Sequence, residues 1–431
     1  MKFLLVNPWV YDFAAYDFWI KPYGLLQIAR ILKDNGFEIH LIDCMDRYHP
    51  DMPLIKENPE FCTGKFYAEV VEKPDVLKFV PRKYKRYGLK MEIFLNEIEK
   101  IVEPDFILVT SVMTYWYPGV FEAVKILKNR FRNSKIIIGG FYASLYPVHA
   151  KLSGADFVIA KRNLKDVSKE LSKIIGKDLK VEDDFPLYDL YPDLRHIGVM
   201  TSIGCPFRCT YCSTPYFFPK MQFLDIEKIF YWIEYYYEKF NVRNIAFYDD
   251  ALLFRAKEHI LRLLNLIIDK GLKINFHTPN GLHARFIDKE VAVAMFKSGF
   301  KTIRVSLESS DPARQKETGG KVYNEDLIRA IENLCYAGYS PKDIGVYVMY
   351  GLPGQTVSEV LKSMEFVNSL GAKIYLTEYS PIPGTKDWEN CKIKGKDPLL
   401  QNNTVYPYFE LRPEEIEYLK QKRKELNSKL F

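Results

Sequence analysis

Three cysteines with a short, defined spacing constrain this chain more than any other feature. Cys205, Cys209 and Cys212 lie within residues 204–212, after an apolar run and among turn residues. Three thiolates on so short a loop can converge on three irons of one four-iron, four-sulfur cluster. With no fourth cysteine close by, the remaining iron keeps an open coordination position. The spacing therefore predicts a 4Fe-4S cluster that can bind a further ligand directly.

Two other interpretations of these cysteines stay open at this point. Free cysteines often serve as small buried apolar residues, and thiolates also bind structural zinc. A structural zinc needs four ligands, and the nearest histidines, His196 and His259, belong to other predicted elements. The spacing favours the cluster.

Length and composition limit the other classes of protein. The chain has 431 residues, 48% of them hydrophobic, which is enough for two or three domains with buried cores. No apolar run reaches the ~18 residues of a membrane span, and the first residues are typical of a strand rather than a signal peptide. The four other cysteines are scattered singly, so they indicate no disulfide framework. We expect a reducing, cytoplasmic location and no membrane partner.

The balance of charge is mild, with a formal net charge of +6. Basic residues gather within residues 78–90, interleaved with Tyr84 and Tyr87. Such a pattern can contact phosphates, but a solvated insertion is the favoured interpretation. Nucleic acid is therefore not expected as a partner.

Apolar strands and amphipathic helices alternate through the first 160 residues. The pattern predicts a doubly wound parallel sheet of the Rossmann or flavodoxin type, with a ligand crevice at the carboxyl ends of its strands. Thr110, Ser111, Gly139 and Gly140 lie at two of these ends. The predicted strands are 3–6, 38–43, 106–111, 135–138 and 157–160, and the predicted helices are 23–35, 91–102, 118–131 and 143–152.

A second alternating series follows, and the cysteine loop lies just after its first strand. Six β/α units are too few for a closed eightfold barrel, so the series predicts a partial (β/α)6, TIM-like barrel. Chemistry in such barrels lies at the carboxyl ends of the strands. The predicted strands are 197–202, 244–248, 274–278, 302–307, 345–350 and 373–378.

Four segments are expected from these patterns: a doubly wound domain over 1–177, an acidic, proline-containing linker over 178–195, the barrel over 196–385, and an extension over 386–431. The insertion 44–90 and the extension are the candidate specificity elements. The extension also carries a predicted polar helix over 413–428.

The cysteine loop, together with ordered phrases at successive strand ends, resembles the radical S-adenosylmethionine enzymes. In this family the amino and carboxylate groups of the cofactor occupy the open iron. An electron from the cluster then splits the sulfonium and releases a 5′-deoxyadenosyl radical. The resemblance implies an external electron donor such as flavodoxin or ferredoxin.

The same resemblance implies a set of cofactor-binding residues at the strand ends. Either Asp249 or Asp250 would accept hydrogen bonds from the amino group of S-adenosylmethionine, although an acidic cap on the next helix is an equal alternative for each. The remaining candidates would contact the adenine, the ribose, the methionyl group or the cluster, and they are Tyr211, Ser306, Glu308, Gly351 and Pro353.

Phrases at residues 22–26, 35–37 and 138–140 resemble the class in which a cobalamin-binding domain precedes the radical core. This resemblance implies cobalamin at Thr110, Ser111, Gly139 and Gly140. No Asp-x-His-x-x-Gly segment follows the first strand, and no Gly-Glu-x-Glu phrase follows the fifth. Cobalamin-dependent radical enzymes commonly lack that histidine too. The alternative is a domain that kept this fold and lost its ligand.

The expected function is a cobalamin-dependent methyltransferase that acts on an unactivated carbon of a small molecule or peptide. The alternative is a cobalamin-independent radical enzyme that performs a dehydrogenation, a rearrangement or a ring closure. A rival from another class is an electron-transfer or scaffold protein, which would need a fourth cluster ligand and no cofactor pocket.

Overall fold

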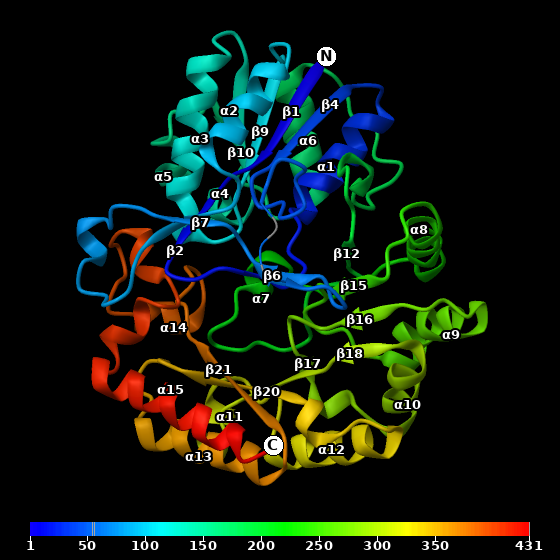
Figure 1. The fold of residues 1–431 in the computed structure, drawn as a ribbon, viewed down its shortest axis with the longest axis vertical. Coiled ribbons are helices and arrows are strands. Elements are labelled where there is room, and N and C mark those ends of the chain that lie inside the picture. Colours follow the sequence, from blue (N-terminus) through cyan, green and yellow to red (C-terminus); the bar gives the residue numbers. More distant parts are fainter. Residues whose placement is uncertain (54, 56, 431) are drawn as a thin grey trace. The chain divides into compact units, whose positions relative to one another are not determined.

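The computed structural model describes residues 1–53, 55 and 57–430. Clustering of contacts divides the chain into two compact units, Met1–Ile197 and Gly198–Phe431. Each unit combines parallel strands with helices (Figure 1). The chain thus has the predicted α/β fold class. The segment expected as a linker packs on the first unit, because the Leu187 N–H donates to the carbonyl of Leu26 at 3.1 Å.

A five-stranded parallel sheet forms the centre of the first unit. Its order is β11-β10-β9-β1-β4. The direction of winding reverses between β1 and β9, which is the switch point where doubly wound sheets bind ligands. The strands match the predicted ones closely, although the last is shorter: β1 (Lys2–Asn7), β4 (Glu38–Asp43), β9 (Phe106–Thr110), β10 (Lys135–Gly139) and β11 (Phe157–Val158).

Helices cover both faces of this sheet (Figure 1). One apolar core lies between the sheet and α2 (Met91–Lys100) and α3 (Tyr117–Arg130). The other lies under α1 (Tyr23–Asp34) and α6 (Leu164–Ile175). The helix expected over 143–152 is instead two short ones, α4 (Phe141–Leu145) and α5 (Pro147–Lys151). The break falls at Pro147, which has no N–H to continue the helical hydrogen bonds.

The insertion after β4 folds with β2 and β3 into two small antiparallel sheets, ordered β2-β8-β7 and β3-β6-β5. Tyr84 and Tyr87 are buried, and Arg86 pairs with Glu69 and Glu122. The expectation of a solvated basic segment is therefore wrong for these residues. The strands are β2 (Val10–Asp12), β3 (Tyr16–Asp17), β5 (Glu57–Asn58), β6 (Thr63–Lys65), β7 (Ala68–Val70) and β8 (Lys85–Tyr87).

The second unit is built on two four-stranded sheets, ordered β12-β15-β16-β18 and β17-β19-β20-β21. The first and fourth predicted strands each split in two, and the third is followed by a separate short strand, β17. The chain passes from one four-stranded sheet to the other after β16 and again after β18. The strands are β12 (His196–Val199), β15 (Asn244–Phe247), β16 (Asn275–His277), β17 (Leu282–His283), β18 (Phe300–Thr302), β19 (Arg304–Glu308), β20 (Gly345–Tyr350) and β21 (Lys373–Glu378).

Helices follow these strands, as a partial β/α barrel requires. Their starts are fixed by side-chain caps such as Asp288, whose carboxylate accepts from the Val291 N–H at 2.8 Å. The helices are α7 (Thr214–Phe217), α8 (Ile226–Lys239), α9 (Ile260–Lys270), α10 (Lys289–Ser298), α11 (Pro312–Glu317), α12 (Asn324–Ala337), α13 (Val357–Ser369), α14 (Lys386–Glu389) and α15 (Pro413–Ser428). A small ribbon joins β13 (Ser202–Ile203) to β14 (Gln222–Phe223).

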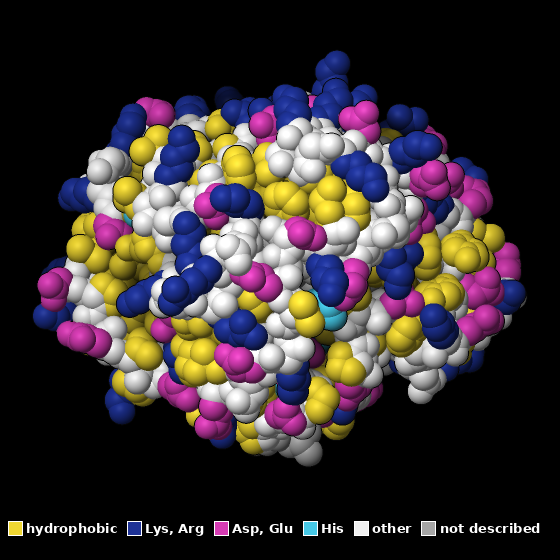
Figure 2. All heavy atoms as spheres, turned by 90° about the horizontal axis from the view of Figure 1, so that it is seen from above, with side chains coloured by type: hydrophobic (Ala, Val, Ile, Leu, Met, Phe, Trp, Pro, Cys, Tyr) yellow, Lys and Arg dark blue, Asp and Glu magenta, His cyan; other side chains and the backbone are white. Residues whose placement is uncertain are grey.

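The face shown in Figure 2 carries Lys and Arg side chains interleaved with Asp, Glu and apolar ones. This mixture agrees with the small net charge of +6. Within the described ranges, no helix combines the length and the apolar character needed to cross a membrane.

The C-terminal helix α15 satisfies the backbone at the edge of the second sheet. The Asn427 side chain accepts from the Ile374 N–H at 2.8 Å and donates to the Ile374 carbonyl at 2.9 Å. Unpaired strand edges are exposed to wrong pairing. Asn427 therefore closes β21, the last strand of the open barrel.

Replacing Asn427 with Ala should lower the free energy of unfolding of the second unit by about 1–3 kcal/mol, because both Ile374 groups would lose their partner in a buried place. Urea unfolding followed by circular dichroism measures this change. Ser428→Ala, a substitution at the exposed neighbouring position, should stay within about 0.5 kcal/mol. Equal stability of the two variants would contradict the role given to Asn427.

Candidate metal and cofactor site

The three cysteines lie on the loop between β13 and α7. Cys205 is buried, while Cys209 and Cys212 are half-buried. The Cys212 N–H donates to the Cys209 carbonyl at 3.1 Å, and the Thr214 N–H donates to the Cys212 sulfur at 3.4 Å. Burial raises the pKa of the Cys205 thiol to about 12. A positive metal centre is what would favour the thiolate at such a position.

The strand that leads into this loop is held by Asp249. Its buried carboxylate accepts from the backbone N–H groups of Thr201 and Ser202, at 3.0 and 2.6 Å, and from both hydroxyls at 2.7 Å. Burial raises the pKa of Asp249 against the effect of these hydrogen bonds. The carboxylate is thus occupied by the protein's own donors.

Two contacts fix the far side of the loop. The Thr210 hydroxyl donates to the Asp387 carboxylate at 3.0 Å, and the Asp387 N–H donates to the Thr210 carbonyl at 3.0 Å. A Cβ at Gly319 would lie 3.0 Å from the carbonyl oxygen of Arg208. The loop therefore has a defined shape, set by residues after β19 and β21. Asp387 was not predicted from the sequence, because an acidic residue in a short helix forms no motif that would indicate a role.

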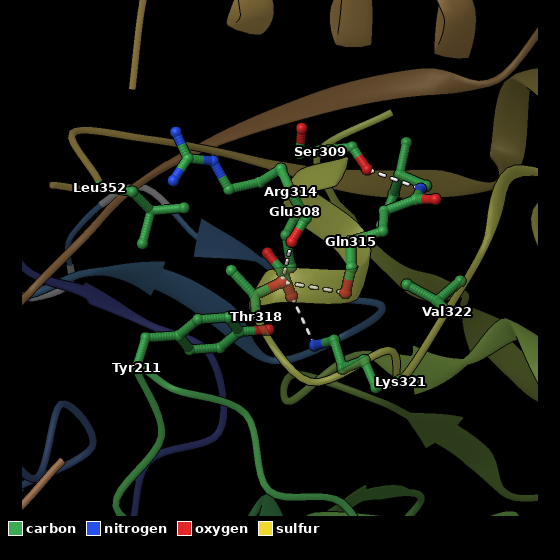
Figure 3. Close-up of a pocket in the computed structure, with 10 residues that line it drawn as sticks. Tyr211, Glu308, Ser309, Arg314, Gln315, Thr318, Lys321, Val322 and Leu352 are labelled. Carbon is green, nitrogen blue, oxygen red and sulfur yellow. Dashed lines mark hydrogen bonds and ion pairs between the residues drawn. The ribbon is translucent and has the colours of Figure 1, made fainter. Parts of the chain in front are cut away.

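A pocket lies beside the cysteine loop, and its polar centre is a buried ion pair. Lys321 Nζ lies 2.7 Å from Glu308 Oε1. Figure 3 shows the Lys321 amino group pointing to Glu308, with the Tyr211 ring next to this pair. Leu352 and Gln315 also line the pocket, as does Arg314, which pairs with Glu359 at 3.1 Å. Tyr211 and Glu308 were predicted from the sequence; Lys321 was not, although it directly follows the flexible pair Gly319-Gly320.

The charges in this pocket are strongly coupled. Burial disfavours the ammonium group of Lys321, but Glu308 and Tyr211 hold its pKa well above the ordinary value. For Tyr211, burial disfavours the charged phenolate form and so raises the pKa of its hydroxyl well above the usual range. The pocket thus offers the Lys321 cation and the Glu308 carboxylate at the edge of the loop, together with the Arg314 guanidinium group. This arrangement suits a ligand that carries both signs of charge.

The other predicted cofactor residues lie at different distances from this pocket. Burial raises the pKa of Asp250 to about 6, and its charge acts on Cys205, so it lies close to the loop. Ser306 is buried beside Gly281, outside the pocket lining. Gly351 packs against Pro407 of the extension. Pro353 is half-buried, and its neighbour Leu352 lines the pocket instead.

One histidine near the loop gave no sequence signal. His283, on β17, lies with its Nε2 4.0 Å from the Cys205 sulfur. Burial, with Lys321 and Arg285 nearby, lowers the pKa of His283 to about 3. The ring is therefore neutral near pH 7.

The arrangement of the sulfurs bears on the zinc alternative. Among the residues that the structure describes, the group whose ligand atoms all lie within 4.8 Å of one another is His49, Asp51 and Glu97. The three thiols are not such a group. Ligands of one ion must crowd around a single centre, whereas cluster ligands each bind a different iron.

The predicted cobalamin residues lie at the carboxyl ends of β9 and β10. A Cβ at Gly139 would meet open space, whereas one at Gly140 would lie 2.5 Å from the Ser111 carbonyl oxygen. The Ser111 hydroxyl donates to the Met113 carbonyl at 3.3 Å, and Thr110 Oγ1 also lies against Gly140. Gly140, Thr110 and Ser111 thus contact one another, and Gly139 faces outward.

Comparison with known proteins gives one family match and several relatives. Residues 199–367 match the family described as the Radical SAM superfamily. An uncharacterized methyltransferase of Pyrococcus horikoshii is 25% identical over 342 residues, which cover 70% of this chain and 73% of the relative. Cytidylyl-2-hydroxyethylphosphonate methyltransferase of Streptomyces wedmorensis is 23% identical over 468 residues and covers 91% of this chain and 82% of the relative.

Solved structures with the same fold include two large enzymes. The radical S-adenosylmethionine methyltransferase TsrM of Kitasatospora setae aligns with a TM-score of 0.66 and 15% identity, over 92% of this chain and 77% of that one. OxsB, a cobalamin-dependent radical enzyme, aligns with a TM-score of 0.56 and 16% identity, over 97% of this chain and 56% of that one. These likenesses establish the fold.

Residues 199–367 carry the Radical SAM domain, so the chain is a radical S-adenosylmethionine enzyme. Its fold is the one seen in TsrM and OxsB. The resemblance stated from the sequence is thereby confirmed.

Replacing Glu308 with Gln should weaken binding of S-adenosylmethionine about tenfold or more, since hydrogen bonds to charged groups contribute about 1.5–3 kcal/mol. Iron content should not change. Equilibrium dialysis of the anaerobic protein, with iron analysis, measures both quantities. Glu317→Gln is the matched control, because Glu317 is an exposed carboxylate on the same segment. Equal affinity of the two variants would contradict a cofactor role for Glu308.

Proposed function

We propose that this protein is a cobalamin-dependent radical S-adenosylmethionine methyltransferase that acts on an unactivated carbon. The observation that carries the proposal is the three-cysteine loop next to a pocket lined by two cations, Lys321 and Arg314, and one carboxylate, Glu308. The names of the two relatives that cover most of this chain support methyl transfer. When bound, the cluster supplies the electron, S-adenosylmethionine the radical, and cobalamin the methyl carrier.

The residues of the second unit would divide the binding of the first two groups. Cys205, Cys209 and Cys212 would hold three irons. Lys321 would attract the carboxylate of S-adenosylmethionine, while Glu308 and Asp250 would accept hydrogen bonds from its amino or ribose groups. Tyr211, the residue before Cys212, would contact the adenine or the cluster. Asp249 keeps the loop in shape, so we assign it a positioning role.

Cobalamin fits the open carboxyl edge of β9 and β10. Val112, Met113 and Phe141 are exposed there, at 43%, 39% and 40%, and Gly139 faces open space beside them. An apolar surface next to a glycine suits the flat, largely apolar corrin ring. Thr110 lies on the same edge, where its hydroxyl can reach the polar tail of the ligand.

The ends of β1 and β4 are filled by the protein itself. Asp43 accepts from Asn7 at 2.6 Å and from the Tyr191 hydroxyl at 2.6 Å. Lys21 pairs with Asp46 in the same buried region. A ligand at this edge of the sheet would therefore lie over β9 and β10.

A cobalamin-independent enzyme is the second candidate. GTP 3′,8-cyclase of Aquifex aeolicus is 27% identical over 236 residues, which cover 52% of this chain and 69% of the relative. The missing Gly-Glu-x-Glu phrase after β11 also favours this alternative. In either case the family's need for a reductant supports a flavodoxin- or ferredoxin-type partner, and an oxygen-sensitive cluster suits the cytoplasm.

Replacing Cys205, Cys209 and Cys212 together with Ala should abolish iron binding and the formation of 5′-deoxyadenosine. The untouched protein should hold about four irons per chain after anaerobic reconstitution. Iron analysis and liquid chromatography with mass spectrometry measure the two properties. Cys335→Ala, which changes a lone thiol on α12, is the control and should retain both. Four irons in the triple variant would refute the cluster assignment.

Replacing Gly139 with Phe should abolish retention of cobalamin and leave the fold intact, because a side chain at this position enters open space without clash. Protein reconstituted with hydroxocobalamin and then desalted is examined by absorbance spectroscopy. Leu152→Phe is the control. Leu152 is 70% exposed and directly follows α5, away from the carboxyl ends of β9 and β10. If the wild-type protein retains no cobalamin, the second candidate function stands instead.

A further inference from the structure

The imidazole ring of His283 faces Cys205, the most buried of the three cysteines. His283 Nε2 lies 4.0 Å from Cys205 Sγ, which is the outer limit for a hydrogen bond to sulfur. His283 is 6% exposed. It comes from β17, so it reaches the loop from a different part of the barrel than the cysteine itself.

The ring of His283 is fixed in this position by aromatic packing. Phe207, two residues after Cys205, stacks on it with centroids 5.1 Å apart and planes 19° from parallel. Phe286 packs at 6.0 Å from both rings. A ring held on this side keeps the edge with Nε2 directed to the sulfur, and the tautomer with its proton on Nε2 can donate from this position.

The three cysteine sulfurs have different surroundings. The backbone N–H of Thr214 faces Cys212, and the backbone N–H of Phe207 faces Cys205. Cys205 also faces the imidazole of His283, which can carry a proton on Nε2. Hydrogen bonds to the sulfurs are among the levers by which proteins set the potential of an iron–sulfur cluster.

We propose that His283 is a positioning residue that donates its Nε2 proton to the Cys205 thiolate and thereby raises the reduction potential of the cluster. This inference rests on the cluster of the proposed function. The reduced cluster carries one more negative charge than the oxidised one, so a donor at a ligand sulfur stabilises the reduced form more. His283 then makes it easier for the external donor to load the cluster.

The test compares two substitutions by anaerobic redox titration, followed by absorbance and electron paramagnetic resonance. His283→Phe keeps the ring on Phe207 and removes the donor. Its reduced-to-oxidised ratio at a fixed potential should fall about tenfold, a shift of about 59 mV to lower potential for one electron. His283→Gln, whose amide can donate, should recover most of this loss. Phe296→Leu, which removes an exposed ring on α10 away from His283, is the control and should leave the potential unchanged.

Each outcome decides the inference. A His283→Phe protein with full iron and the wild-type potential overturns it, as does loss of iron in both His283 variants, which would give the residue a structural role. If only the Phe variant loses iron, a wild-type potential in the Gln variant supports the donor. A wild-type protein that binds no iron would instead refute the proposed function.

Discussion

The site depends on one buried carboxylate. Asp249 accepts hydrogen bonds from four donors on Thr201 and Ser202, so the strand that enters the cysteine loop has a fixed end. Burying a charge is costly unless its hydrogen bonds are complete, and here they come from the backbone and hydroxyls of the strand itself. The cysteines that follow are therefore placed by β15, a strand next to their own. The hydrogen bond between Thr210 and Asp387, which follows the last strand β21, also fixes the cysteine loop.

Strand positions were largely predictable because buried parallel strands leave apolar runs bounded by turn residues. By contrast, the sequence could not show which of Asp249 and Asp250 faces the cysteine loop. The two acids follow the end of β15, where the chain bends at Asp250, so strand periodicity does not say where either side chain points. Asp249 turns to Thr201 and Asp250 to the loop. Lys321 and His283 were not predicted for another reason. Their roles come from contacts across the barrel, and periodicity within one segment does not encode such contacts.

In the first unit, filled and open strand ends lie along one edge of the same sheet. Asn7, Asp43 and Tyr191 close the ends of β1 and β4 with buried hydrogen bonds. The exposed apolar residues are instead beside β9 and β10. A doubly wound sheet offers its crevice at the switch point, here between β1 and β9. The buried hydrogen bonds among Asn7, Asp43 and Tyr191 fill the β1 and β4 side of this crevice, so its open part lies at β9 and β10.

The backbone is strained at Glu308. Glu308 has a φ of +68°, a left-handed conformation that costs a non-glycine residue about 1–3 kcal/mol. The register between β19 and β20 shifts between Ser306 and Glu308, so the strain coincides with an irregularity in the ladder. This local twist separates the two side chains: Ser306 stays buried beside Gly281, whereas Glu308 reaches the pocket and pairs with Lys321. A regular strand would place residues two apart on the same side. The strained turn is therefore what delivers a carboxylate to the cysteine loop, and the buried ion pair holds it there.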